Sequence, residues 1–300
     1  MMRRAAFTLI ELIFVIVIMG ILSKFGVEFL MQAYYTFIYS KINHELQSRS
    51  ELAVQTIANR LQYRIPQSTI KRIQPTNHFT LAPEWVANPD EYNILEWIGY
   101  DIDGFRGGSN GQPLWSGIID LNDTLTTAAK LFSPDTNTTA INNLIDALSG
   151  STIADAALFF NSADYDEDGF GWDGGAVLND HTRAMHPVNA LSANEFSSSL
   201  GVDFSSMRVY NRYFLAWTAY AVVHDAENAK LWLHYDYQPW QNENYNSNTA
   251  KKRLLMDNVD TFRIRPSPDG TLFNIIVCAE SKLIVGTMEE HSLCKEKVIF

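Results

Sequence analysis

The side chains that could do chemistry in this chain include a dense acidic loop near its middle. Carboxylates stand at alternate positions, Asp164, Asp166 and Asp168, and the glycine that follows can turn the loop so that their oxygens converge. This spacing is typical of the first half of a calcium-binding loop, because hard cations bind several oxygen ligands at once. Gly175 stands where an EF-hand has its bidentate glutamate, so an EF-hand is not predicted.

The remaining ligands of this predicted calcium site must come from residues farther along the loop. Three residues could complete the oxygen shell: Asp173, Asn179 or Asp180. The predicted metal set is Asp164, Asp166, Asp168 and Asp173, and the alternative is a solvated acidic turn without a metal. Calcium is favoured because carboxylates at this density repel one another without a counterion. A shorter element, Asp101-x-Asp103-Gly104, is interpreted as a simple turn.

A second unusual group is the carboxylate of Glu11, which lies inside an apolar run. Residues 5–22 contain no other ionisable side chain, and Arg3 and Arg4 precede them. Eighteen nearly uncharged residues reach the lower limit for a membrane-spanning helix. The run extends to residue 31 if Lys24 and Glu28 reach the membrane interface. The positive-inside rule predicts a cytoplasmic N-terminus, and the chain after about residue 30 is expected to lie outside the inner membrane.

The elements that must position these groups begin with one long helix. The first proline is Pro66, so a helix over residues 7–64 is predicted, and it would be roughly 87 Å long. A bilayer core is only about 30 Å thick, so the helix projects out of the membrane. Its second half has an apolar stripe that can pack on a globular domain, formed by Ile42, Leu46, Ala53, Ile57 and Leu61.

The carboxylate of Glu11 needs a partner, because a charge inside a membrane costs a few kcal/mol. One interpretation is that it lies near the cytoplasmic interface, hydrated or protonated; the other is that a neighbouring copy supplies a positive charge. The residues from Arg3 to Leu12, RRAAFTLIEL, resemble the class III leader and mature start of type IV prepilins and type II secretion pseudopilins. The basic leader, the FTLIEL string and the apolar run coincide, which makes the resemblance specific over about the first 30 residues.

The resemblance implies how the N-terminus is processed and assembled. A prepilin peptidase would remove the leader, residues 1–6, by cutting between Ala6 and Phe7, and would methylate the new terminal amine. Ala6 replaces the glycine that usually precedes this cut. Glu11 would then neutralise the terminal amine of an adjacent subunit. Removal of the leader takes away two arginines, which changes the net side-chain charge from −11 to −13.

The rest of the chain, residues 66–300, is predicted to form a head built on an antiparallel sheet. Residues 213–223 and 231–237 are expected to pair as a hairpin, and residues 259–265 and 272–279 to form two later strands around a Pro- and Gly-rich turn. Packing of this sheet on the helical stripe gives an α+β fold, as the family resemblance also implies. Residues 120–200 are interpreted as an insertion, with a short helix that Thr138 or Thr139 caps and Gly150 ends.

Two further features concern the late strands. Residues 254–263, LLMDNVDTFR, resemble a segment before late strands of J-type minor pseudopilins. Cys278 and Cys294, the only cysteines, are sixteen positions apart in the region predicted to be exported, where the periplasm would oxidise them. A disulfide is therefore predicted, and the spacing does not fit a redox-active pair.

The net charge and the motifs that the sequence lacks disfavour nucleic-acid binding and several classes of enzyme. The net charge of −11 opposes binding of phosphate backbones, and no nucleophile elbow, P-loop or zinc-protease motif occurs. We therefore expect a non-enzymatic minor pseudopilin or pilin, in a periplasmic filament or its tip complex for secretion. Its expected partners are the prepilin peptidase, other pilins, the inner-membrane assembly platform and inner-membrane lipid. The alternatives are a pilus or competence subunit acting in adhesion or DNA uptake, and an anchored enzyme.

Overall fold

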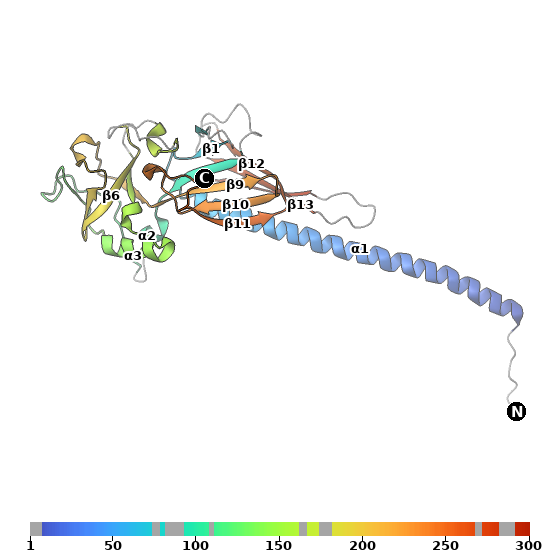
Figure 1. Ribbon diagram of the computed structural model, residues 1–300. Helices are drawn as coiled ribbons and strands as arrows, with labels where there is room; N and C mark the ends of the chain where they lie inside the picture. The colour runs from blue at the N-terminus through green and yellow to red at the C-terminus, as the bar shows by residue number, and fades with distance from the viewer. Residues whose placement is uncertain are drawn as a thin grey trace.

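A single helix, α1 (Leu9–Leu61), leads from the N-terminal end of the chain into the head (Figure 1). The computed structural model describes residues 8–73, 79–81, 93–107, 111–161, 167–173, 182–267, 272–281 and 292–300. The 53 residues of α1 are about 80 Å long at 1.5 Å per residue. The predicted long helix is confirmed; it ends at Leu61, and Arg64 then pairs with Gly99 in an isolated β-bridge.

The central layer of the head is a six-stranded antiparallel sheet of order β11-β10-β9-β3-β1-β2. Its strands are β1 (Ile70–Arg72), β2 (Phe79–Leu81), β3 (Ile94–Gly99), β9 (Thr218–Asp225), β10 (Lys230–Tyr235) and β11 (Lys251–Asp257). Both faces of β3 are buried, because α1 covers one side and residues of a third sheet pack on the other. This third sheet, of order β4-β7-β6-β5-β8, is called the distal sheet. The middle of the six-stranded central sheet is therefore buried within the head, whereas most of the edge strand β11 is exposed.

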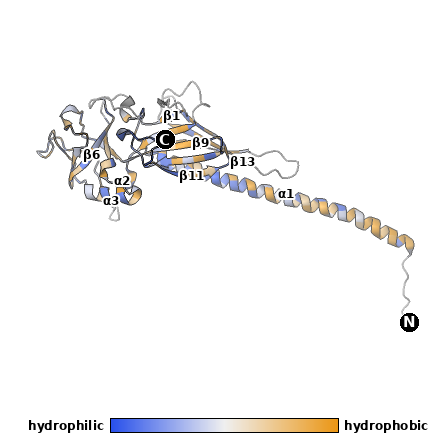
Figure 2. Ribbon diagram, viewed as in Figure 1, coloured by the Kyte–Doolittle hydropathy of each residue, from blue (hydrophilic) through white to orange (hydrophobic). Residues whose placement is uncertain are grey.

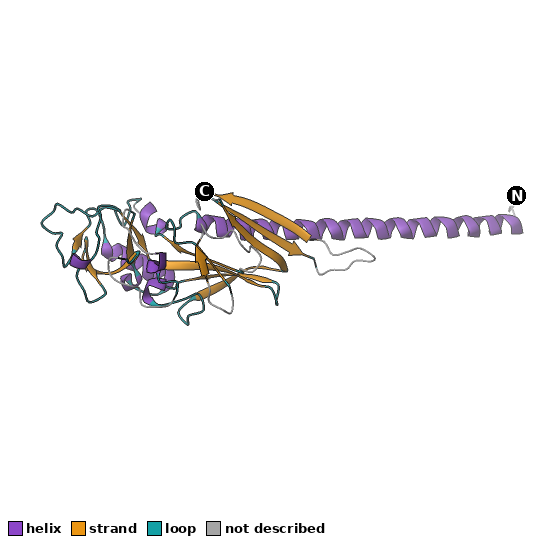
Figure 3. Ribbon diagram, turned by 90° about the horizontal axis from the view of Figure 1, so that it is seen from above, coloured by secondary structure: helices purple, strands orange, loops and turns teal. Residues whose placement is uncertain are grey.

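A second sheet has three strands in the order β12-β13-β14 and lies alongside the C-terminal part of α1 (Figure 3). Its strands are β12 (Val259–Pro266), β13 (Phe273–Glu280) and β14 (Ser292–Ile299). The side chains of Ile275 and Val277 reach the same buried cluster as the helical stripe. The antiparallel sheet predicted to cover the stripe is thus confirmed, together with the α+β class.

The predicted stripe of α1 forms the centre of this core. Leu46, Ala53, Ile57 and Leu61 are all buried, and Ile42 is partly buried at the edge of the cluster. Between them the helix also buries Ser50, Val54 and Ala58. Small residues at these positions allow strands to lie close to the helix on two sides.

The end of the head farthest from the N-terminus is formed by the distal sheet, of order β4-β7-β6-β5-β8 (Figure 1). Its strands are β4 (Leu131–Phe132), β5 (Ala157–Phe160), β6 (Met185–Ser192), β7 (Glu195–Ser198) and β8 (Tyr213–Ala216). The helix α3 (Thr138–Ser149) adds Ile141 and Ile145 to its core. Asn137, rather than either threonine, caps α3. Gly150 ends the helix as predicted, and it does so in the left-handed conformation.

The expectation of one strand over residues 213–223 is wrong. The chain leaves the distal sheet after β8 and enters the central sheet at β9, with the buried Trp217 at the break. The apolar run is continuous because both sheets bury these residues, so hydrophobicity does not mark the crossing. The predicted hairpin consequently forms between β9 and β10 only.

Candidate assembly site

The N-terminal half of α1 is an apolar rod that the head does not cover (Figure 2). Its large apolar side chains from Leu9 to Met31 are each between 44% and 78% exposed. The most apolar stretch has a mean hydropathy of 2.3, and none of that stretch is buried within the chain. Apolar surface on every side of a helix needs a lipid or protein environment, and the length and composition of this half support a single-pass membrane anchor.

Glu11 lies in the first turn of this rod, where its side chain is exposed. No cation among the described residues reaches its carboxylate, whereas Glu28 lies 4.0 Å from Lys24 on the same helix. A negative charge in the first turn is favoured by the helix dipole. Ala6 and Phe7, the residues of the predicted cleavage site, lie outside the described residues.

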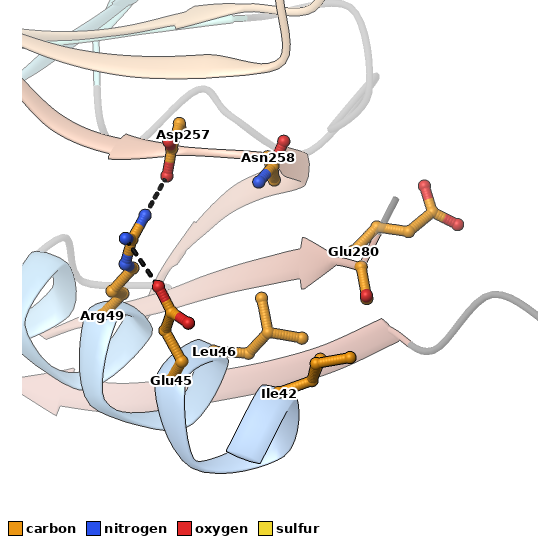
Figure 4. A pocket seen from close by; sticks show the side chains of 8 residues that line it. Ile42, Glu45, Leu46, Arg49, Asp257, Asn258 and Glu280 are labelled. Atoms are coloured by element: carbon orange, nitrogen blue, oxygen red, sulfur yellow. Dashed lines mark hydrogen bonds and ion pairs between the residues drawn. The ribbon is translucent and has the colours of Figure 1, made fainter. Parts of the chain in front are cut away.

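Where α1 enters the head, three charged side chains, Glu45, Arg49 and Asp257, connect the helix to the central sheet through ion pairs. Arg49 donates to Asp257 of β11 at 2.6 Å and lies 2.7 Å from Glu45, one turn earlier (Figure 4). These side chains line an open pocket of about 360 Å³ with Ile42 and Leu46. All three charges are about half exposed, so each pair contributes no more than roughly 1 kcal/mol.

The predicted disulfide between Cys278 and Cys294 is present. The two cysteines are directly opposite each other on β13 and β14, the central and edge strands of the sheet beside α1. Closing a loop of this length contributes on the order of 3 kcal/mol in the chain-entropy model. The bond therefore links the edge strand β14, which packs against α1, to its neighbour β13.

The predicted calcium site falls mostly outside the described residues. Asp164 and Asp166 are not described, and only the backbone of Asp168 is, within the short 3-10 helix η3 (Glu167–Phe170). Asp173 is exposed. Within the described ranges no group of three metal-binding side chains occurs. Calcium binding by this loop stays a prediction.

Sequence reasoning missed a fully buried ion pair between β1 and β3. Arg72 is 1% exposed and Glu96 is fully buried, and the guanidinium donates to the carboxylate. The Tyr237 hydroxyl donates to the other oxygen of Glu96 at 2.9 Å, and Arg72 also donates to the Trp172 carbonyl at 2.9 Å. Burial raises the pKa of the Glu96 carboxyl, and the guanidinium opposes this shift. The available signal was a single charge within the apolar run ILEWI.

Asp101, which was interpreted as part of a turn, is a buried carboxylate that caps the helix α2 (Ile102–Arg106). Its Oδ1 accepts from the Gly104 amide at 3.0 Å and from the Trp217 indole at 3.3 Å. Its Oδ2 is buried with no hydrogen-bond partner among the described residues. Burial raises the pKa of the Asp101 carboxyl despite these hydrogen bonds.

This raised pKa predicts a pH dependence of stability. A carboxyl with a higher pKa in the folded than in the unfolded state stabilises the fold below the unfolded pKa, near 4, and this contribution is lost as pH rises through the folded pKa. Asp101→Asn keeps the cap without the buried charge. We expect the variant to be at least as stable as the parent at about pH 7, and to lose this advantage towards about pH 4.

Thermal unfolding of the full chain across this pH range measures the difference. Asp146→Asn, which changes an exposed aspartate of α3, is the control and should leave the pH profile unaltered. A parent and an Asp101→Asn profile that run parallel at every pH would contradict the argument.

Comparison with known protein families finds a match at the N-terminal end of the chain. Residues 1–23 match the family model of the prokaryotic N-terminal methylation motif. The motif therefore covers the leader, Glu11 and the first part of α1, and it supports a type IV pilin- or pseudopilin-like protein. Comparisons with curated proteins and with solved structures give no match to this chain.

Proposed function

We propose that this chain is a structural, non-enzymatic subunit of a type IV pilin-like filament. The observation that carries the proposal is the position of the methylation motif, which leads directly into an apolar helix that the head leaves exposed. Before assembly, inner-membrane lipid would cover this half of α1. After assembly, the helices of other pilin-like subunits would cover it, with the head on the periplasmic side.

Within this class we propose a minor pseudopilin of a secretion system, placed at or near the filament tip. The distal sheet extends the head beyond the two sheets that surround α1, and a head of this bulk would crowd a tightly packed repeating array. The J-type resemblance of residues 254–263 also favours this assignment. The alternative is a minor pilin for adhesion or DNA uptake, and the net charge of −11 weighs against DNA as its ligand.

Processing of the N-terminus tests the proposal directly. When the chain is produced with a prepilin peptidase, we expect the mature protein to begin at Phe7 and to carry one methyl group on its amine. Ala6→Leu should leave the leader attached to most of the protein, because the peptidase accepts a small residue before the cut. Mass spectrometry of the intact chain reads both outcomes.

The matched control is Ala5→Leu, which adds the same bulk one position earlier and should still be processed. An unprocessed parent chain, or an Ala6→Leu variant that is cleaved as completely as the parent, would count against the assignment.

A further inference from the structure

A pocket of about 340 Å³ is lined by Phe105 of α2, by Tyr100 next to β3 of the central sheet, and by Tyr213 and Phe214 of β8 in the distal sheet. Most of its lining is apolar, from Tyr100, Phe105, Trp115, Ile118, Tyr213 and Phe214. We name it the Trp115 pocket. Its volume is at the lower end of the range for small-ligand sites, about 300–1,000 Å³, which suits one side chain rather than a polymer.

The floor of the Trp115 pocket is formed mainly by aromatic rings, and Ser116, Gly117 and Asn161 also line the pocket. Trp115 is 1% exposed, and its indole N–H already donates to the Asp101 carbonyl at 3.1 Å. The hydroxyl of Tyr213 is 2.9 Å from that of Ser133, in a buried network. Because these polar atoms have partners within the chain, the floor favours an apolar group.

The rim exposes apolar surface on both sides of the opening. Phe105 is 42% exposed, and its ring centre lies 4.8 Å from that of Trp115. Ile118 is 48% exposed on the other segment. Large exposed apolar side chains around a preformed pocket are characteristic of the anchor sites of protein–protein interfaces.

A free cation stands at the same rim. Arg212 is exposed, and its backbone pairs with Ile118 in an isolated β-bridge. Within the described part of the chain its guanidinium has no hydrogen bond or ion pair, although the chain carries an excess of carboxylates. A guanidinium in this position is complementary to a carboxylate next to the apolar group that enters the pocket.

We propose that the Trp115 pocket binds a partner protein through one aromatic or branched aliphatic side chain that stands beside a carboxylate. The side chain enters between Phe105 and Ile118, the exposed apolar residues of the rim. The carboxylate accepts hydrogen bonds from Arg212. This site lies on the head, apart from the exposed N-terminal half of α1.

The test uses the full chain in lipid nanodiscs and two small probes. N-acetyl-para-fluorophenylalanine carries the ring and the carboxylate, and its carboxamide keeps the ring without the charge. In fluorine NMR titrations we expect the acid to bind about tenfold more tightly than the amide. Phe105→Ala should weaken both probes by about three- to tenfold, because it removes one wall of the pocket.

Arg212→Gln separates recognition of the carboxylate from recognition of the ring. It should reduce the acid to the affinity of the amide and leave the amide unchanged. Arg253→Gln, on the exposed part of β11, is the matched control and should change neither affinity. Because no other subunit is present, the result does not depend on filament assembly.

Three outcomes would overturn the proposal. The acid and the amide could bind the parent chain equally, which would remove the role of Arg212. The fluorine signals of both probes could be no broader with the chain in nanodiscs than with empty nanodiscs, which would mean that neither probe binds. Finally, methyl glucoside could bind in an Arg212-dependent manner while both aromatic probes fail, which would make the pocket a saccharide site.

Discussion

Replacing Arg72 with methionine is expected to lower the free energy of unfolding by about 3–5 kcal/mol. The variant leaves the Glu96 carboxylate fully buried, with the Tyr237 hydroxyl as its remaining side-chain donor. It also removes the hydrogen bond to the Trp172 carbonyl, which joins β1 to the segment that follows η3. Chemical denaturation of the full chain in a mild detergent, followed by tryptophan fluorescence, measures the loss.

The control is a variant that removes the charges together. Arg72→Met, Glu96→Leu and Tyr237→Phe in one chain replace the polar network by apolar groups of similar size. Its stability should recover most of the loss, because a buried ion pair contributes little beyond what apolar packing supplies. If the single and the triple variant are equally destabilised, the loss comes from altered packing rather than from the unpaired carboxylate.

Replacing Glu11 with glutamine is expected to reduce assembly with other pilin-like subunits by at least about 100-fold. This expectation rests on the proposed function, in which Glu11 neutralises the methylated amine of a neighbouring Phe7. The neutral amide would leave that amine charged and unpaired within the apolar helix bundle. The measurement is the amount of the chain that co-purifies with the other subunits after chemical cross-linking in membranes.

Glu28→Gln is the matched control on the same helix. Glu28 already faces Lys24, so its loss removes only an exposed pair between successive turns, worth a few tenths of a kcal/mol. We expect near-normal assembly for this variant, and normal membrane insertion and head folding for both. Normal assembly of Glu11→Gln would mean that the carboxylate is not the partner of a terminal amine.

Much of the helix could be predicted from the sequence. Residues 5–22, with one charge among them, predict a membrane anchor, and the spacing of the stripe predicts which face of α1 meets the head. A helical face is read from local periodicity, so these predictions need no knowledge of distant residues. The disulfide could also be predicted, but for another reason: the chain has two cysteines, so each has only one possible partner within the chain.

The middle of the central sheet was harder to predict because its strands β3 and β9 are largely buried on both faces. A strand covered by α1 on one face and by the distal sheet on the other has no alternation of polar and apolar residues. The break at Trp217 is therefore invisible in the pattern, although the two halves of this run belong to different sheets.

By itself the sequence determined the anchor, the processing motif, the buried face of α1 and the disulfide. In each case the physical cause acts over neighbouring residues or over a single possible pairing. Only the tertiary structure decided that Arg72 meets Glu96, that Asp101 is buried, and that Arg212 lines the Trp115 pocket with no ion-pair partner among the described residues. These features arise where strands from distant parts of the chain adjoin, and residue types alone do not specify which strands become neighbours.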